Sequence, residues 1–96
     1  MKFLVIMRPN GQPYQIESEQ VRQYAGEVRA ALSSGDVEAA YAFVAGGGAF
    51  VTSADNSRDL LLKVRMNPYF KASHVEVIPI VDADVFLEGL ADYKGL

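Results

Sequence analysis

The sequence contains no cysteine and no tryptophan, and it has a single histidine. Without cysteine, a disulfide scaffold, a thiol nucleophile and a thiolate metal site are all excluded. One histidine also argues against a structural zinc site. Four aspartates stand where helices are expected to start, and we interpret them as helix caps rather than metal ligands: Asp55, Asp59, Asp82 and Asp84. We expect neither a metal ion nor another cofactor.

Basic residues are few, with nine Lys and Arg against twelve Asp and Glu, for a net charge of −3. Nucleic acids and anionic membrane surfaces are bound by clustered Lys and Arg, so neither partner is expected. The apolar run Met1–Met7 is too short for a signal peptide or a membrane span, and Arg8-Pro9-Asn10-Gly11 ends it. A cytoplasmic location is the prediction.

Hydrophobic residues, by contrast, make up 50% of the 96 residues. A chain of this length forms a single domain, residues 1–96, with a modest core. A small domain that is rich in apolar residues favours burial of some of them against a partner, although a rich core is the alternative.

The first half of the chain predicts a strand, a helix and two further strands. Phe3–Met7 is apolar at every position, which is typical of a central strand buried on both faces. Ser18 is the expected N-cap of a helix that Gly35 ends. Strands are expected over 36–44 and 49–54, joined by a glycine turn. The buried stripe of the helix should consist of Val21, Tyr24, Val28, Ala31 and Leu32.

The second half predicts a helix, a strand and a tail helix. Asp55-Asn56-Ser57 is a helix start, and Asn67-Pro68 is a helix break. A strand follows over 74–81, where Pro79 favours a place at the sheet edge. A tail helix is expected over 84–93. The buried residues of the second helix should be Leu60, Leu61 and Val64, and the apolar residues of the tail helix are Val85, Phe86, Leu87 and Leu90.

This β-α-β-β-α-β order predicts a ferredoxin-like α+β fold, a four-stranded antiparallel sheet with two helices on one face. The other face should be polar in a soluble monomer, but Phe3–Met7 leaves it apolar. Either the tail helix covers that face or a second copy packs sheet to sheet against it. We favour a homodimer, or a higher homo-oligomer, with the tail helix closing one end or reaching the neighbour.

The stretch from Tyr41 to Asp82 resembles a known group. Its features are Tyr41-Ala42-Phe43-Val44, a Leu-rich helix, Asn67-Pro68-Tyr69-Phe70 and Val75-Glu76-Val77-Ile78-Pro79-Ile80. It resembles the muconolactone isomerase-like dimeric α+β barrel proteins and is similar to the YciI-like group. The resemblance implies a dimeric α+β barrel that handles a small molecule. The catalytic residues of neither group have counterparts here.

Three polar side chains are candidates for catalysis or for binding a charged ligand. His74 is the one histidine of the sequence and shares a sheet face with Glu76, so the two form a candidate catalytic pair for proton transfer. Alternatively, His74 simply begins an edge strand and Glu76 makes a rim contact. Arg8 is a candidate for binding a ligand carboxylate, or it pairs with an acid at the end of the sheet.

Three tyrosines are further ligand-binding candidates in a pocket between sheet and helices: Tyr14, Tyr41 and Tyr69. Tyr41 alternatively belongs to the dimer interface. Two functions follow. The first is an isomerase-like enzyme that moves a proton on a small carboxylated or lactone metabolite. The second is a non-catalytic dimeric ligand-binding or accessory module. A concave pocket that contains His74, Glu76 or Arg8 would favour the enzyme.

Overall fold

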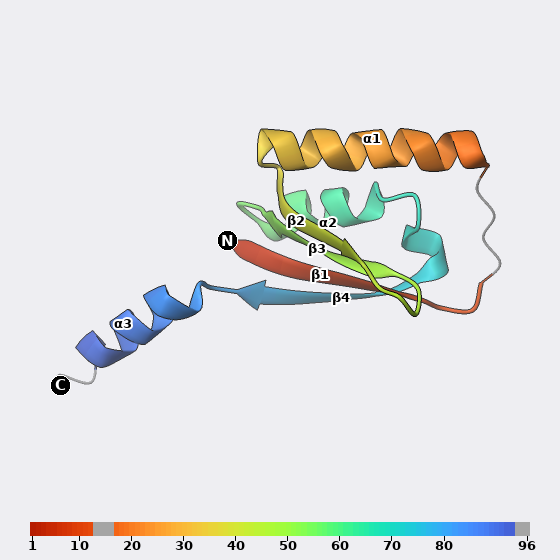
Figure 1. The fold of residues 1–96 in the computed structure, drawn as a ribbon. Helices are drawn as coiled ribbons and strands as arrows, with labels where there is room; N and C mark the ends of the chain where they lie inside the picture. Colours follow the sequence, from red (N-terminus) through yellow and green to blue (C-terminus); the bar gives the residue numbers. More distant parts are fainter. Residues whose placement is uncertain (13–16, 94–96) are drawn as a thin grey trace.

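The computed structural model describes residues 1–12 and 17–93, which form an α+β fold (Figure 1). Every helix and strand expected from the sequence is present, with ends shifted by up to two residues, and a short 3₁₀ helix precedes the last strand. In chain order the elements are β1 (Lys2–Pro9), α1 (Ser18–Ser34), β2 (Val37–Ala42), β3 (Gly48–Ser53), α2 (Ser57–Arg65), η1 (Phe70–Ala72), β4 (Ser73–Ile80) and α3 (Ala83–Tyr93).

The four strands form one open antiparallel sheet in the order β2-β3-β1-β4. β1 is a central strand, in agreement with its apolar composition, and Val5 lies opposite Phe50 of β3 and Val77 of β4. β4 is an edge strand, as Pro79 predicted, because the proline nitrogen has no hydrogen to donate to a further strand.

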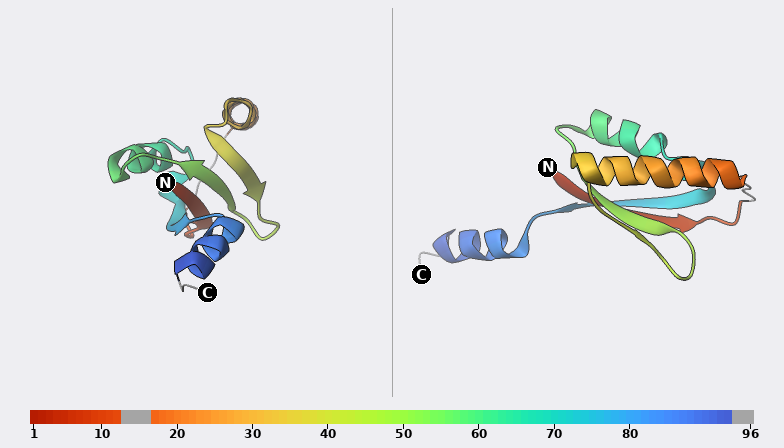
Figure 2. Two further views of the ribbon diagram at one scale, coloured as in Figure 1. Left: turned by 90° about the vertical axis from the view of Figure 1, so that its left-hand side faces the viewer. Right: turned by 45° about the horizontal axis from the view of Figure 1, so that its top comes forward.

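The two faces of the sheet have different environments. Side chains alternate along β1, and Phe3, Val5 and Met7 are buried on the face that carries the helices. α1 and α2 both lie over this face, and they are separated from each other (Figure 2). Leu4 and Ile6 point to the opposite face, which we call the open face.

The core lies between the sheet and α2. Its buried hydrophobic residues are Phe3, Val5, Met7, Ala54, Leu60 and Val64. Leu60 and Val64 are one turn apart and point to the sheet, whereas Leu61 is 53% exposed. The prediction that Leu61 belongs to the buried stripe is therefore wrong, because a helix on the surface of a sheet buries only its inner face.

α1 contributes no buried residue, so its predicted buried stripe is wrong as well. Val21 is 44% exposed and Leu32 is 39% exposed, while Tyr24, Val28 and Ala31 are only half-buried. The reason is that α1 packs mainly against β2 and stands away from α2, so its apolar side borders open space.

Both ends of α1 are capped. The N-cap is Glu17, one residue before the predicted Ser18, because the backbone N–H of Glu17 donates to Gln20 Oε1 at 3.0 Å in a capping box. At the other end Gly35 is left-handed, with φ of +81°, as expected for a glycine that ends a helix.

Within the described residues, none of the four aspartates makes the predicted cap hydrogen bond to an N–H two or three residues further along the chain. α2 is capped by Asn56, whose Oδ1 accepts the Asp59 N–H at 2.9 Å, so Asp59 lies in the first turn instead. The Asp82 carboxylate binds Lys2 at 2.9 Å, and its backbone carbonyl accepts the N–H of Phe86. Asp84 Oδ1 accepts the N–H of Val85 at 2.9 Å.

α3 extends away from the body of the molecule (Figures 1 and 2). The molecule accordingly measures 57 × 29 × 28 Å, and no residue of α3 is buried. The alternative in which the tail helix covers the open face within the same chain is not observed, because β4 leads directly outward into α3. No helix within residues 1–12 and 17–93 combines the length and the apolar composition that crossing a membrane requires.

Candidate functional site

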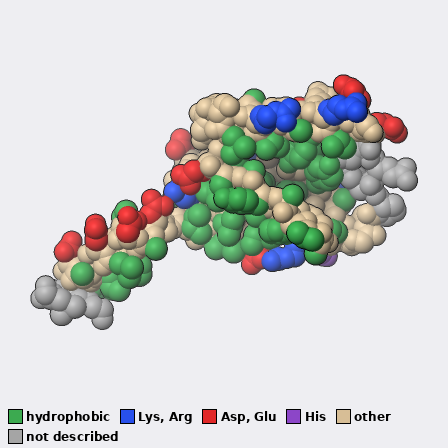
Figure 3. Space-filling view, in the orientation of Figure 1, with side chains coloured by type: hydrophobic (Ala, Val, Ile, Leu, Met, Phe, Trp, Pro, Cys, Tyr) green, Lys and Arg blue, Asp and Glu red, His purple; other side chains and the backbone are tan. Residues whose placement is uncertain are grey.

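A cleft of about 1050 Å³ lies between α1, α2 and the sheet. Its floor is formed by Met7, Phe50 and Ala40, and Val28 and Leu62 belong to its two helical walls. Hydrophobic side chains gather in the body below α1 (Figure 3). The cleft exists because α1 and α2 each cover a different part of the same face, which leaves the floor between them uncovered.

One end of the cleft is built around Tyr24, in the first half of α1. Asn67 Nδ2 donates to Tyr24 Oη at 2.8 Å, and Asn67 Oδ1 accepts the backbone N–H of Tyr69 at 2.9 Å. The rings of Tyr24 and Tyr69 meet edge to face with centroids 5.4 Å apart. The side-chain amide of Asn67 thus links the Tyr24 hydroxyl to the backbone at Tyr69.

The other end is built around Lys63 of α2. Lys63 Nζ lies 3.0 Å from Asp36 Oδ1 and donates to Ser53 O at 2.7 Å and Thr52 Oγ1 at 3.2 Å. The Thr52 hydroxyl in turn donates to the backbone carbonyl of Asp36 at 2.8 Å, so this buried hydroxyl is satisfied. This network links α2 to β2 and β3.

The described residues that line the cleft carry more negative than positive charge. Lys63 is the one basic residue among the described residues that line it, and Asp36 neutralises it. Glu27 of α1 adds a second carboxylate to the lining and makes no ion pair with any described residue. The described part of the cleft is therefore apolar with a small excess of negative charge.

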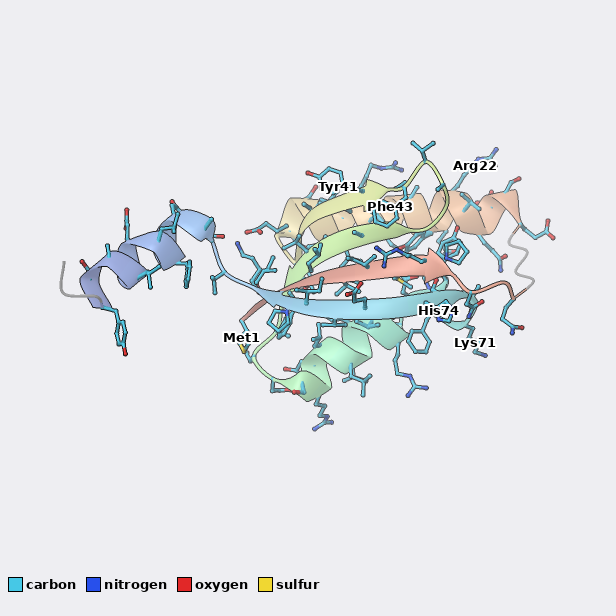
Figure 4. All side chains as sticks on the ribbon, turned by 90° about the horizontal axis from the view of Figure 1, so that it is seen from below. Met1, Arg22, Tyr41, Phe43, Lys71 and His74 are labelled. Carbon is cyan, nitrogen blue, oxygen red and sulfur yellow. The ribbon has the colours of Figure 1, made fainter. Side chains whose placement is uncertain are left out.

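The three candidate tyrosines have different positions. Tyr69 lines the cleft and contacts Tyr24. Tyr41 borders the cleft from β2, but its side chain is 71% exposed and points to the opposite face from Ala40 (Figure 4). Tyr14 lies outside the described residues.

The three candidate polar residues lie together on the open face and outside the cleft. His74 and Glu76 share this face, as the spacing predicted, and Arg8 lies opposite His74 on the neighbouring strand (Figure 4). Arg8 Nη1 contacts Glu76 Oε1 at 3.2 Å, and both side chains are more than half exposed. Within the described residues Glu76 is thus paired with Arg8, and it makes no hydrogen bond to His74.

The sequence interpretation missed Tyr24, Lys63 and Asn67 as cleft residues. Tyr24 has the helical spacing of a core residue, Lys63 reads as a solvated helix residue, and Asn67 precedes a proline and reads as a helix break. No local signal in the sequence indicates that Asn67 binds the hydroxyl of Tyr24. This contact depends on how α1 and α2 are placed in space.

The chain matches no protein-family model, and no curated protein is significantly similar to it.

Proposed function

We propose that this chain is a homodimeric small-molecule-binding protein of ferredoxin-like fold, related to the muconolactone isomerase-like and YciI-like dimeric α+β barrels. The strand order β2-β3-β1-β4, with antiparallel neighbours throughout and both crossover helices on one face, supports that fold. The ligand occupies the cleft between α1 and α2 in each protomer.

The single observation that carries the binding function is the cleft itself. Ligand sites in proteins are concave, mainly apolar and about 300–1000 Å³ in volume, with a few polar groups that orient the ligand. The cleft is mainly apolar and, at about 1050 Å³, lies just above this range, and it has Tyr24 and Asn67 at one end and Lys63 at the other.

The open face supports the homodimer. Its centre is apolar, with Leu4 beside Val51 and Ile78 on the neighbouring strands. Ion pairs flank this centre, Arg8–Glu76 toward one end and Lys2–Glu38 toward the other. A copy related by a two-fold axis would meet the same apolar surface with both signs of charge around it, which is the self-complementarity that an isologous interface requires.

A titration followed by amide NMR tests the cleft. Uniformly ¹⁵N-labelled protein is titrated with a panel of small aromatic lactones, ketones and carboxylates. A ligand of the cleft should shift the amide signals of Val28, Ala31 and Phe50, whereas the signals of Leu4 and Ile78 on the open face should stay in place.

A matched pair of variants makes the test specific. Ala31 lines the cleft and its neighbour Ala30 is exposed. Ala31→Trp should fill the cleft and abolish binding, while Ala30→Trp should leave the dissociation constant unchanged. If no panel compound shifts the cleft signals, or if Ala31→Trp binds as the wild type does, the cleft is not a ligand site.

The second candidate is the isomerase, favoured by the position of His74 and Glu76 on one sheet face beside Arg8. In that function His74 would accept a proton next to a carbonyl while Arg8 held a carboxylate. All three lie outside the cleft, which is why binding without catalysis ranks first. His74→Ala should abolish turnover of any lactone that the protein isomerises, and an unchanged rate would exclude His74 as the base.

A further inference from the structure

We infer that the ligand of the cleft is an uncharged ring compound with a hydrogen-bond acceptor, which receives the hydroxyl proton of Tyr24. This inference rests on the proposed binding function and specifies the class of ligand. Of the two ligand classes that the sequence led us to expect, it retains lactones and excludes carboxylated metabolites.

The hydrogen-bonding state of Tyr24 favours a ligand that carries an acceptor. Its Oη accepts a hydrogen bond from Asn67 Nδ2 at 2.8 Å. A phenol also donates one proton, and within residues 1–12 and 17–93 that proton has no acceptor. Asn67 is itself held in place by the backbone N–H of Tyr69 at 2.9 Å. The Tyr24 hydroxyl is therefore a fixed donor at the end of an apolar cleft, suited to a carbonyl, ether or hydroxyl oxygen.

The charges of the cleft favour an uncharged ligand. An anion moved from water into an apolar cleft needs a cation or several donors to compensate for lost hydration. The ammonium group of Lys63 is 3.0 Å from the Asp36 carboxylate and already donates to Thr52 and Ser53. Glu27 in the same lining repels an anion further. The described cleft thus disfavours a carboxylate and accepts a neutral molecule.

The arrangement of the apolar side chains in the cleft favours a compact ring compound. The rings of Tyr24 and Tyr69 both line the cleft and stand at 62° to each other, so they do not form a flat slot. Phe50 and Met7 on the floor and Val28 on α1 add contact surface beyond these rings. A compact ring system of one or two rings gains aromatic and apolar contacts on several sides at once.

Three probes that differ by one group test the inference: 1-indanone, indane and indane-1-carboxylate. Dissociation constants are measured by amide NMR titration of the full chain. We expect 1-indanone to bind about 2- to 10-fold more tightly than indane, because it adds one neutral hydrogen bond. Indane-1-carboxylate should bind more weakly than either.

Variants assign the effects to residues. Tyr24→Phe should weaken 1-indanone binding by about 2- to 10-fold and leave indane binding unchanged, which also shows that the cleft is intact. Tyr93→Phe removes a hydroxyl from an exposed side chain of α3 that does not line the cleft and serves as the matched control, with no change expected. Glu27→Gln should strengthen binding of indane-1-carboxylate but not of indane.

Two results with the indane probes would overturn the ligand class. One is that indane-1-carboxylate binds at least as tightly as 1-indanone. The other is that Tyr24→Phe leaves the 1-indanone affinity unchanged. In both cases the probes still shift the cleft signals, and the proposed binding function stands. If the indane series is silent while carboxylates of the wider panel bind, the ligand class is likewise wrong; if nothing in the panel binds, the binding function itself fails.

Discussion

At the scale of single residues, Lys2 joins three segments at one end of the open face. Its Nζ lies 2.9 Å from Asp82 Oδ1 and 3.1 Å from Glu38 Oε2. The hydrogen bond to Asp82 raises the pKa of Lys2 above its ordinary value of 10.5, and the hydrogen bond to Glu38 adds to this rise. Lys2 therefore fixes the junction between β4 and α3 to the start of β1.

This raised pKa predicts a loss of stability at high pH. Because the folded-state pKa of Lys2 lies above the unfolded value, its stabilisation is complete below pH 10.5 and falls as pH rises through the folded pKa. Urea unfolding between pH 9 and pH 12 should show this decline, and Lys2→Met should reduce it. Arg8→Met, at the other end of the face, is the control; an identical pH profile for Lys2→Met and wild type would contradict the prediction.

Gly47 is constrained by its close approach to β1. Its φ is +80°, and a Cβ at this position would meet the backbone carbonyl oxygen of Met7. Gly47→Ala should therefore lower the free energy of unfolding by more than about 1 kcal/mol, since both the left-handed backbone and the β1 contact are disturbed. Chemical denaturation at fixed protein concentration measures this change.

Gly26 is the control position for Gly47, because alanine should stabilise the protein there. It lies inside α1, and a Cβ there would meet nothing within 4 Å. Gly26→Ala should raise the free energy of unfolding by about 0.5–1 kcal/mol, because alanine favours the helix more than glycine does. If Gly47→Ala is as well tolerated as Gly26→Ala, the turn does not require glycine.

At the scale of elements, α2 depends on its cap and its inner face. Asn56 Oδ1 accepts the Asp59 N–H at 2.9 Å, and Leu60 and Val64 are buried against the sheet. Lys63 and Arg65 in the last turn complement the negative end of the helix dipole. α1 is different, because it is capped at both ends and yet buries no residue.

Removal of the α2 cap should have a measurable cost. Asn56→Ala should lower the free energy of unfolding by about 0.5–2 kcal/mol, because the Asp59 N–H loses its acceptor. Ser57→Ala, at the first helical position and with no side-chain hydrogen bond within the described residues, should change stability by less than about 0.5 kcal/mol. Equal effects of the two substitutions would show that Asn56 does not act as the cap.

At the scale of the whole molecule, two apolar surfaces lack a partner within the described chain. The open face exposes Tyr41, and α3 carries an exposed apolar side. Acidic atoms lie along the upper side of α3 and hydrophobic atoms along its lower side (Figure 3). The exposed apolar residues of α3 are Val85, Phe86, Leu87, Leu90 and Tyr93.

The proposed homodimer predicts a sensitive position at the centre of the open face. Leu4 is flanked by Val51 and Ile78, so Leu4→Lys should place an uncompensated charge in the interface. Light scattering at micromolar concentration should give twice the chain mass of 10.5 kDa for the wild type and 10.5 kDa for the variant. Val44→Lys, at the fully exposed hairpin, should remain dimeric. A monomeric wild type would refute the homodimer.

The sequence alone was enough to predict the helices, the strands and the central position of β1. These features depend on local signals: the apolar run Phe3–Met7, the glycine at the end of α1 and Pro79 in an edge strand. Such signals act over a few residues, so composition and spacing are sufficient to identify them.

The tertiary structure decided where the apolar faces point. Tyr24 has the spacing of a core residue, but the separation of α1 from α2 places it at a cleft beside Asn67, 43 residues further along the chain. Arg8 and Glu76 meet only because β1 and β4 are neighbours. Periodicity reveals that a helix has an apolar side; what that side faces depends on how far apart the elements pack, and that distance is set by the whole fold.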